Sequence, residues 1–213
     1  MDLLRVTEIF FSLQGETKTV GLPTVFIRLT GCPLRCHYCD TAYAFHGGTK
    51  YTLDALLCEV KKYNTRYVTV TGGEPLAQKA CYLLLQRLCD ENYEVSLETS
   101  GALPLTQVDT RVIKVMDIKT PGSGEVAKND WQNLSSLLAH DQIKFVICNE
   151  ADYQWSKTIL VQYQLANVCH VLFSPAYQQM NPRHLADWII RDQLPVRLQI
   201  QLHKFLWGDV AGC

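Results

Sequence analysis

Three cysteines lie close together in the chain with the spacing C-x3-C-x2-C, at Cys32, Cys36 and Cys39. Thiolates on one loop can hold three corners of a [4Fe–4S] cluster, whereas a cluster that only transfers electrons normally takes four cysteines. One iron is then left open for another ligand. This pattern favours S-adenosylmethionine, whose amino and carboxylate groups can chelate that iron and place the sulfonium beside the cluster.

A structural zinc site is the alternative use of these three cysteines. Such a site needs four closed ligands, and either His37 or His46 offers the fourth. A disulfide framework fits small secreted chains, but this chain has 213 residues and starts without the basic and apolar segments of a signal peptide. The other six cysteines have no metal-ligand spacing. Cysteine usage therefore predicts a reducing, cytoplasmic location.

The overall composition favours a small-molecule substrate. With 47% hydrophobic residues, the chain can bury a full core as a single domain spanning residues 1–213. Its 20 basic and 21 acidic residues are well mixed and the net charge is −1. We therefore expect no direct contact with nucleic acid, which calls for a basic patch. No apolar stretch reaches the roughly 18 residues of a membrane span, so we expect no membrane partner.

Apolar segments and helical patterns alternate along the chain. Strands are predicted at residues 24–29, 67–70, 94–97, 112–118, 142–147, 170–173 and 196–201. Helices are predicted at residues 53–60, 76–91, 130–139, 150–164 and 182–191, with Thr52 and Asn181 as N-caps of the first and last. Repeated β-α units predict an α/β fold, a partial (incomplete) (β/α) barrel of six to seven mostly parallel strands. An open doubly wound sheet is the rival, but its Gly-rich fingerprint is missing after the first strand.

Polar residues follow most of these strands at their carboxyl ends, where parallel α/β folds place their chemistry. This pattern predicts an active site at one rim of the barrel. The rim would receive Arg28, the cysteine loop, residues 71–75, residues 98–101, residues 117–119, residues 174–175 and residues 203–204.

Four features of the sequence each allow a structural and a functional interpretation. Gly72-Gly73-Glu74-Pro75 is either a tight turn or a receptor for the amino group of S-adenosylmethionine. Arg28, late in an apolar strand, pairs with a structural or a substrate carboxylate. Gln14-Gly15-Glu16 is either a hairpin turn or a set of partners for a nitrogen-rich ring. His203 alone would be a core histidine.

Together these residues resemble the radical S-adenosylmethionine (radical SAM) superfamily, and within it the 7-carboxy-7-deazaguanine synthases of queuosine biosynthesis. The superfamily resemblance rests on the three cysteines and on the Thr71-Gly-Gly-Glu-Pro75 motif. The narrower resemblance rests on residues 9–16, 26–28, 31–32, 39–41, 98–99, 117–119 and 201–204, so it covers nearly the whole chain.

The resemblance implies a fold and a reaction. The fold would be a partial barrel of the radical SAM type in a cytoplasmic homodimer. The reaction is a lyase-type ring contraction of 6-carboxy-5,6,7,8-tetrahydropterin to 7-carboxy-7-deazaguanine with loss of ammonia. The reduced cluster would cleave S-adenosylmethionine, and the resulting 5′-deoxyadenosyl radical would take the hydrogen at pterin C6 and later return it. An electron donor such as a flavodoxin or a ferredoxin would reduce the cluster.

The resemblance also implies roles for individual residues. The cluster ligands would be Cys32, Cys36 and Cys39, and Thr41 would help to hold Mg²⁺. The residues around S-adenosylmethionine would be Tyr38, Cys39, Asp40, Gly72, Gly73, Glu74, Asp117, Ile118, Lys119, Ser174, Pro175, Ala176 and Tyr177. The residues that contact the substrate would be Leu13, Gln14, Gly15, Glu16, Arg28, Thr71 and His203.

One departure from the family concerns the C-terminus. Residues 205–213 run beyond the point where short members end, and in those members the terminal residue reaches the substrate. That contact is not expected here, and the tail is assigned to the dimer instead. Two rival functions stand beside the synthase: a glycyl-radical-enzyme activase, also a radical SAM enzyme, and a zinc-stabilised binding module without catalysis.

Overall fold

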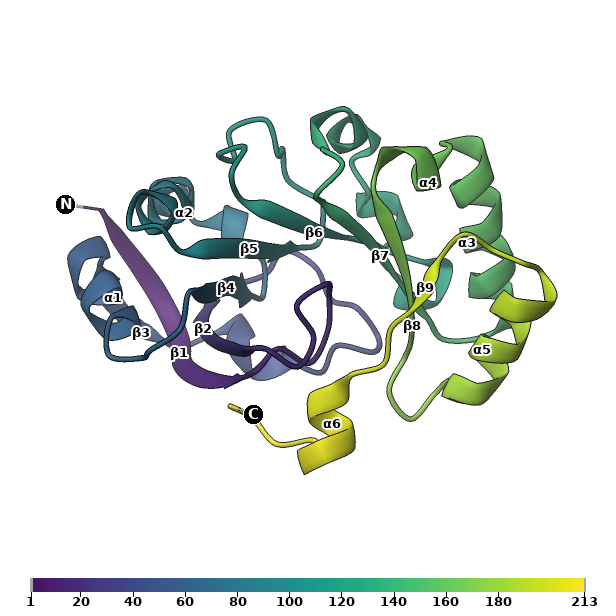
Figure 1. Ribbon diagram of the computed structural model, residues 1–213, viewed down its shortest axis with the longest axis horizontal. Helices are drawn as coiled ribbons and strands as arrows, with labels where there is room; N and C mark the ends of the chain where they lie inside the picture. The colour runs from purple at the N-terminus through teal and green to yellow at the C-terminus, as the bar shows by residue number, and fades with distance from the viewer. Residues whose placement is uncertain (1, 213) are drawn as a thin grey trace.

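The computed structural model describes residues 2–212 of the chain (Figure 1). Its strands are β1 (Leu3–Leu13), β2 (Pro23–Leu29), β3 (Thr49–Thr52), β4 (Tyr67–Gly72), β5 (Glu94–Thr99), β6 (Ile113–Ile118), β7 (Gln142–Ile147), β8 (His170–Pro175) and β9 (Arg197–Leu198). Its α-helices are α1 (Leu53–Val60), α2 (Ala80–Asp90), α3 (Glu150–Gln162), α4 (Leu165–Val168), α5 (Pro182–Arg191) and α6 (Leu202–Trp207). The 3₁₀ helices are η1 (Ala42–Phe45), η2 (Pro75–Ala77), η3 (Pro121–Ser123), η4 (Val126–Lys128) and η5 (Trp131–Ser136).

One curved sheet joins all of these strands in the order β3-β1-β2-β4-β5-β6-β7-β8-β9. β1 runs antiparallel to β2 and β3, and the remaining neighbours are parallel. The edge strands β3 and β9 do not meet within residues 2–212, so the barrel stays open. Helices α1, α2, α3 and α5 lie outside the curve (Figure 1). The predicted α/β partial barrel is confirmed, with two antiparallel strands added at one edge.

Capping residues begin two of the predicted helices as expected. The side chain of Thr52 accepts a hydrogen bond from the backbone N–H of Ala55 at the start of α1. Asn181 accepts one from the backbone N–H of Arg183 at the start of α5, with Pro182 in the first turn. Each cap satisfies a backbone donor that has no partner inside its helix.

Two predicted helices differ from the structure. Residues 130–139 contain the 3₁₀ helix η5 instead of an α-helix, because Asn133 binds the neighbouring loop through Gly101 O, Leu103 O and the N–H of Leu105. Asparagine and serine in this segment compete with helical backbone bonds. The helix predicted at residues 76–91 begins only at α2, because the backbone of Gln78 is extended.

The prediction also missed β1, β3, α4 and α6, and β9 is shorter than the predicted strand at residues 196–201. After β9 the chain leaves the sheet edge. It then runs toward the open side of the barrel, where α6 lies near the N-terminal strand (Figure 1).

The loop between β1 and β2 enters the barrel. Leu13 pairs with Pro23 at the amino end of β2, which is the end opposite the cysteine loop. From there the amide of Gln14 donates to Thr69 on β4 (3.2 Å), and Gly15 O accepts from the N–H of Leu202 (2.9 Å). Residues 14–16 therefore close the interior from below, and we call them the floor.

No helix within residues 2–212 has both the length and the apolar character needed to cross a membrane.

Candidate functional site

A cavity of about 240 Å³ occupies the inside of the barrel, between the floor and the cysteine loop. The structure brings all of the predicted site residues to its lining except Glu74 and Ile118, which lie behind the surface. The inward-pointing residues of β4 to β8 form the wall, as expected at the carboxyl ends of parallel strands. Residues far apart in the sequence thus share one chamber.

The cysteine loop is held over the chamber by backbone hydrogen bonds. The N–H of Gly31 donates to Ala44 O (2.8 Å), and the N–H of His37 donates to Ser123 O (3.0 Å). All three thiols of the loop are free and partly exposed toward the cavity. Burial raises the pKa of Cys36 to about 11, so metal binding would displace a proton from this thiol.

The ligands of a single metal ion must meet at one centre, whereas those of an iron–sulfur cluster need not. Within residues 2–212, no group of three or more His, Cys, Asp or Glu side chains is gathered around one point. A [4Fe–4S] cluster binds each thiolate through a different iron, so separated thiols fit it. Neither His37 nor His46 lines the cavity, and the His37 ring instead lies over Gly124.

The Gly72-Gly73 turn packs directly beneath this loop. A Cβ atom on Gly72 would come within 2.4 Å of Leu29 O, and one on Gly73 would lie 2.3 Å from Gly31 O and 2.7 Å from the Cβ of Cys32. A side chain at Gly73 would therefore displace the loop that carries the thiols, and one at Gly72 would displace the end of β2 that leads into it. The sequence predicted that the backbone of Gly72-Gly73 would approach another group closely, and in the structure that group includes the cysteine loop.

Glu74 organises this turn from within. Its carboxylate is fully buried and accepts hydrogen bonds from the N–H of Leu76, the hydroxyl of Thr99, and both the N–H and the hydroxyl of Ser100. Glu74 was expected to contact S-adenosylmethionine, but both of its oxygens bond to residues that tie the end of β4 to β5. Ile118 is likewise a core residue, with 2% of its surface exposed.

Two buried oxygen atoms beside the thiols have no hydrogen-bond partner among the described residues, the hydroxyl of Tyr38 and Oδ1 of Asp117. Both residues line the cavity. Lys119 pairs with the other oxygen of Asp117 (2.9 Å). Buried polar atoms normally have partners, so these two atoms could pair with a polar ligand bound in the cavity.

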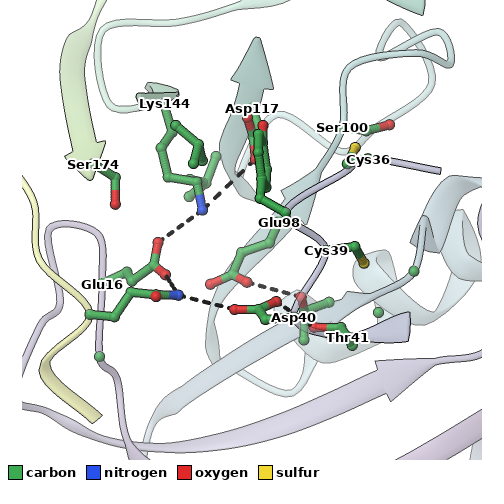
Figure 2. Close-up of a pocket in the computed structure, with 18 of the residues that line it drawn as sticks. Glu16, Cys36, Cys39, Asp40, Thr41, Glu98, Ser100, Asp117, Lys144 and Ser174 are labelled. Atoms are coloured by element: carbon green, nitrogen blue, oxygen red, sulfur yellow. Dashed lines mark hydrogen bonds and ion pairs between the residues drawn. The ribbon is translucent and has the colours of Figure 1, made fainter. Parts of the chain in front are cut away.

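A chain of hydrogen-bonded charged and polar side chains links Lys144, Glu16 and Asp40 in the chamber (Figure 2). Lys144 on β7 donates to Glu16 (2.8 Å), and the amide of Gln201 donates to both Glu16 (3.0 Å) and Asp40 (3.3 Å). Lys204 then donates to Asp40 (2.8 Å). Burial alone would raise the pKa of Glu16, but the charge of Lys144 and the hydrogen bonds from Lys144 and Gln201 together outweigh it and hold that pKa below its usual value. The floor therefore presents the ionised carboxylate of Glu16 to the chamber.

Arg28 and His203 both line the chamber. The Nε–H of Arg28 donates to Glu8 (2.6 Å), so a structural carboxylate is present, while the same residue also lines the cavity. His203 lies against Gly15, where a Cβ atom would come within 1.9 Å of its Nδ1. Burial lowers the pKa of His203 below its ordinary value, which favours the neutral ring.

Lys144 is the site residue that the sequence analysis missed. The signal was available, because a lysine in the middle of the apolar strand Gln142–Ile147 resembles the arginine in β2. Glu98, Gln201 and Lys204 were noted in motifs or at the rim but received no role. Each of them now has one: Glu98 accepts from Thr71 (2.9 Å), and the other two bridge the charged groups described above.

Comparisons with known proteins show the family of this chain. Residues 26–116 match the family described as the Radical SAM superfamily. A 7-carboxy-7-deazaguanine synthase from Chlorobaculum tepidum is 44% identical over 211 residues, covering 98% of this chain and 96% of that relative. One from Koribacter versatilis is 42% identical, covering 96% and 97%. The crystal structure of QueE from Escherichia coli has a TM-score of 0.78 at 22% identity, covering 94% of this chain and 95% of that chain, which supports the fold.

Proposed function

The chain belongs to the 7-carboxy-7-deazaguanine synthase family of radical SAM enzymes, and from this membership we propose that it converts 6-carboxy-5,6,7,8-tetrahydropterin to 7-carboxy-7-deazaguanine in queuosine biosynthesis. The reaction contracts the pterin ring and releases ammonia, as a carbon–nitrogen lyase does. The observation that supports it most is that a single chamber holds the three free thiols above an ionised, hydrogen-bonding floor.

Membership in this family implies a [4Fe–4S] cluster and S-adenosylmethionine as cofactors. When bound, they supply the one-electron chemistry that removes a hydrogen atom from the substrate. The three cysteines would hold the cluster. Tyr38 and Asp117 would offer their unpaired oxygens to S-adenosylmethionine, with residues 174–177 on the far wall. Glu74 would act only as a positioning residue, because its oxygens are already bonded.

The floor and the C-terminal segment would orient the pterin. Glu16 would accept hydrogen bonds from the ring N–H groups, and Arg28 would receive the carboxylate that the substrate carries. His203, held against Gly15, closes the chamber on the side of the C-terminal segment and excludes water from the reacting ring. These residues fix the orientation in which one hydrogen atom faces the cofactor side.

Thr41 would hold Mg²⁺ between the protein and the substrate. Its hydroxyl donates to Asp40 (2.9 Å), which turns the lone pairs of the hydroxyl oxygen away from that carboxylate. Both residues line the cavity and offer oxygen ligands. Mg²⁺ often takes few protein oxygens and completes its six ligands with water and substrate, so this donor set fits the ion.

We expect Thr41→Ala to weaken divalent-ion binding by about tenfold or more, because a direct oxygen ligand is lost. Titration with Mn²⁺ followed by electron paramagnetic resonance measures this binding without turnover. The cluster content should stay unchanged. Thr49→Ala, on the exposed edge strand β3, is the matched control. Equal Mn²⁺ affinity in the Thr41 variant and the parent would remove Thr41 from the metal site.

The assay for the function uses anaerobically purified, iron-reconstituted and reduced protein. It receives S-adenosylmethionine, Mg²⁺ and the carboxytetrahydropterin, and the expected product is the carboxydeazaguanine. If intact cluster and S-adenosylmethionine cleavage are present but no deazaguanine forms, the synthase proposal is wrong and a glycyl-radical-enzyme activase becomes the better explanation. Bound zinc without iron would support the binding module.

Two partners belong to this proposal. A second copy of this chain would cover α6 and the following tail, where Phe205 is 79% exposed and Leu206, Trp207 and Val210 are also exposed. We expect light scattering of the cluster-loaded protein to give the mass of a dimer, and a monomer mass at micromolar concentration would contradict this. A flavodoxin or a ferredoxin would supply the electron in the cytoplasm.

A further inference from the structure

Lys144 is a buried cation that has no role in the proposed reaction so far. It is the third residue of β7, and its side chain points into the chamber toward Glu16 and Asp117 (Figure 2). Its Nζ atom lies 2.8 Å from Oε2 of Glu16 and 4.0 Å from Oδ2 of Asp117. Only the first of these distances allows a hydrogen bond.

The ammonium group of Lys144 is therefore incompletely satisfied. An ammonium carries three N–H donors, and within residues 2–212 only Glu16 accepts from this one. Burial alone would lower the pKa of Lys144, but the charges of Glu16, Asp117 and Glu98 raise it, so the group is charged. A buried charge normally uses its donors, so the remaining ones indicate an acceptor on a bound ligand.

The neighbouring Glu16 makes this donor specific. A carboxylate oxygen and an ammonium nitrogen 2.8 Å apart offer one acceptor and one donor side by side, facing the same cavity. A cyclic lactam presents the complementary pair, an N–H beside a C=O. The oxopyrimidine half of a pterin has this edge, with N3–H next to the oxygen on C4.

We propose that Lys144 is a specificity-determining residue that donates to the C4 oxygen of the pterin while Glu16 accepts from N3–H. This inference rests on the proposed function. The pair would reject a ring with an amino group at C4, because that group would bring a donor against the ammonium. Buried hydrogen-bonding sites discriminate strongly against analogues that leave their groups unpaired.

The alternative is a structural role, in which Lys144 only neutralises the carboxylates around it. In that case its loss would disturb the whole floor and would affect 4-oxo and 4-amino pterins to the same extent. The ratio of their affinities separates the two roles. Such a ratio does not depend on the fraction of protein that is correctly folded, provided that both ligands are measured on the same sample.

The experiment measures the binding of 6-carboxytetrahydropterin and its 4-amino analogue to cluster-loaded protein without reductant, followed by kcat/KM for both. We expect the parent to prefer the 4-oxo ring by about a hundredfold or more. Lys144→Met should weaken binding of the 4-oxo compound by about a hundredfold and of the 4-amino compound by less than about threefold. An unchanged preference in this variant would overturn the proposal.

Two further variants serve as a control and as a second test of the role of Lys144. Lys157→Met removes a lysine of α3 that pairs with Asp192 outside the chamber, and it should leave the preference intact. If Lys144→Met does not fold, Lys144→Gln keeps a polar side chain that accepts as well as donates, and it should also lose the preference. A parent that makes no deazaguanine refutes the proposed function, whereas a productive parent with unchanged preference in the Lys144 variants refutes only this inference.

Discussion

Replacing Cys36 with alanine is expected to lower turnover by at least about a thousandfold. Enzymes accelerate their reactions by roughly a million-fold or more, so a loss of this size is well within what a cofactor can supply. The reason is that two thiols, Cys32 and Cys39, cannot hold a cluster that needs three protein corners. The change removes a partly exposed thiol from the cavity wall and leaves the backbone bonds of the loop in place. The fold should therefore survive while the cofactor does not.

Iron content and visible absorbance near roughly 400 nm measure the cluster directly in this variant. Cys58→Ala is the matched control, because Cys58 is an exposed thiol on α1 and does not line the chamber. The control should keep the iron and the activity of the parent. Full iron loading with normal turnover in Cys36→Ala would show that this thiol is no cluster ligand.

Replacing Glu74 with glutamine is expected to lower the free energy of unfolding by about 2–4 kcal/mol. The fully buried carboxylate accepts from Leu76, Thr99 and Ser100, and an amide would place N–H donors against some of these donors. Ser100 would lose the most, since both its N–H and its hydroxyl donate to one oxygen. The turn under the cysteine loop would then lose its tie to β5.

Urea unfolding of the anaerobic protein measures this change, with iron content recorded in parallel. Glu59→Gln is the matched control, because Glu59 forms an exposed ion pair with Lys62 on the surface and should change stability by less than about 0.5 kcal/mol. If Glu74→Gln is as stable as the control, the hydrogen bonds of this carboxylate do not stabilise the fold. The reduced iron content expected of Glu74→Gln would link the turn to cluster binding.

Local patterns in the sequence predicted much of the fold and of the site. The cysteine spacing, the Gly72-Gly73 turn and the caps at Thr52 and Asn181 all depend on residues within a few positions of one another. Alternation of strands and helices then sufficed to predict a partial barrel, because parallel strands impose their connections. The position of the site at the carboxyl ends of the strands followed from that topology.

The missed features depend on contacts between distant segments. β3 is a short edge strand of partly and fully exposed residues, so no hydrophobic pattern marks it. α6 is six residues long and only Lys204 in it is buried, and its position follows from Leu202 bonding to Gly15. Spacing along the chain contains no information about that pairing. Lys144 was passed over because its partner, Glu16, lies 128 positions away.

The bond between the floor and the C-terminal segment, residues 201–204, has a consequence for the order of events during synthesis. Gln201 bonds to Glu16 across 185 positions, so this contact can form only when almost the whole chain has been made. Contacts of such long range form late in folding. The thiols at residues 32–39 emerge much earlier, while the chamber beneath them is still open on that side. A newly made chain therefore carries the cysteine loop well before residues 201–204 are available to bond with Glu16 and Asp40.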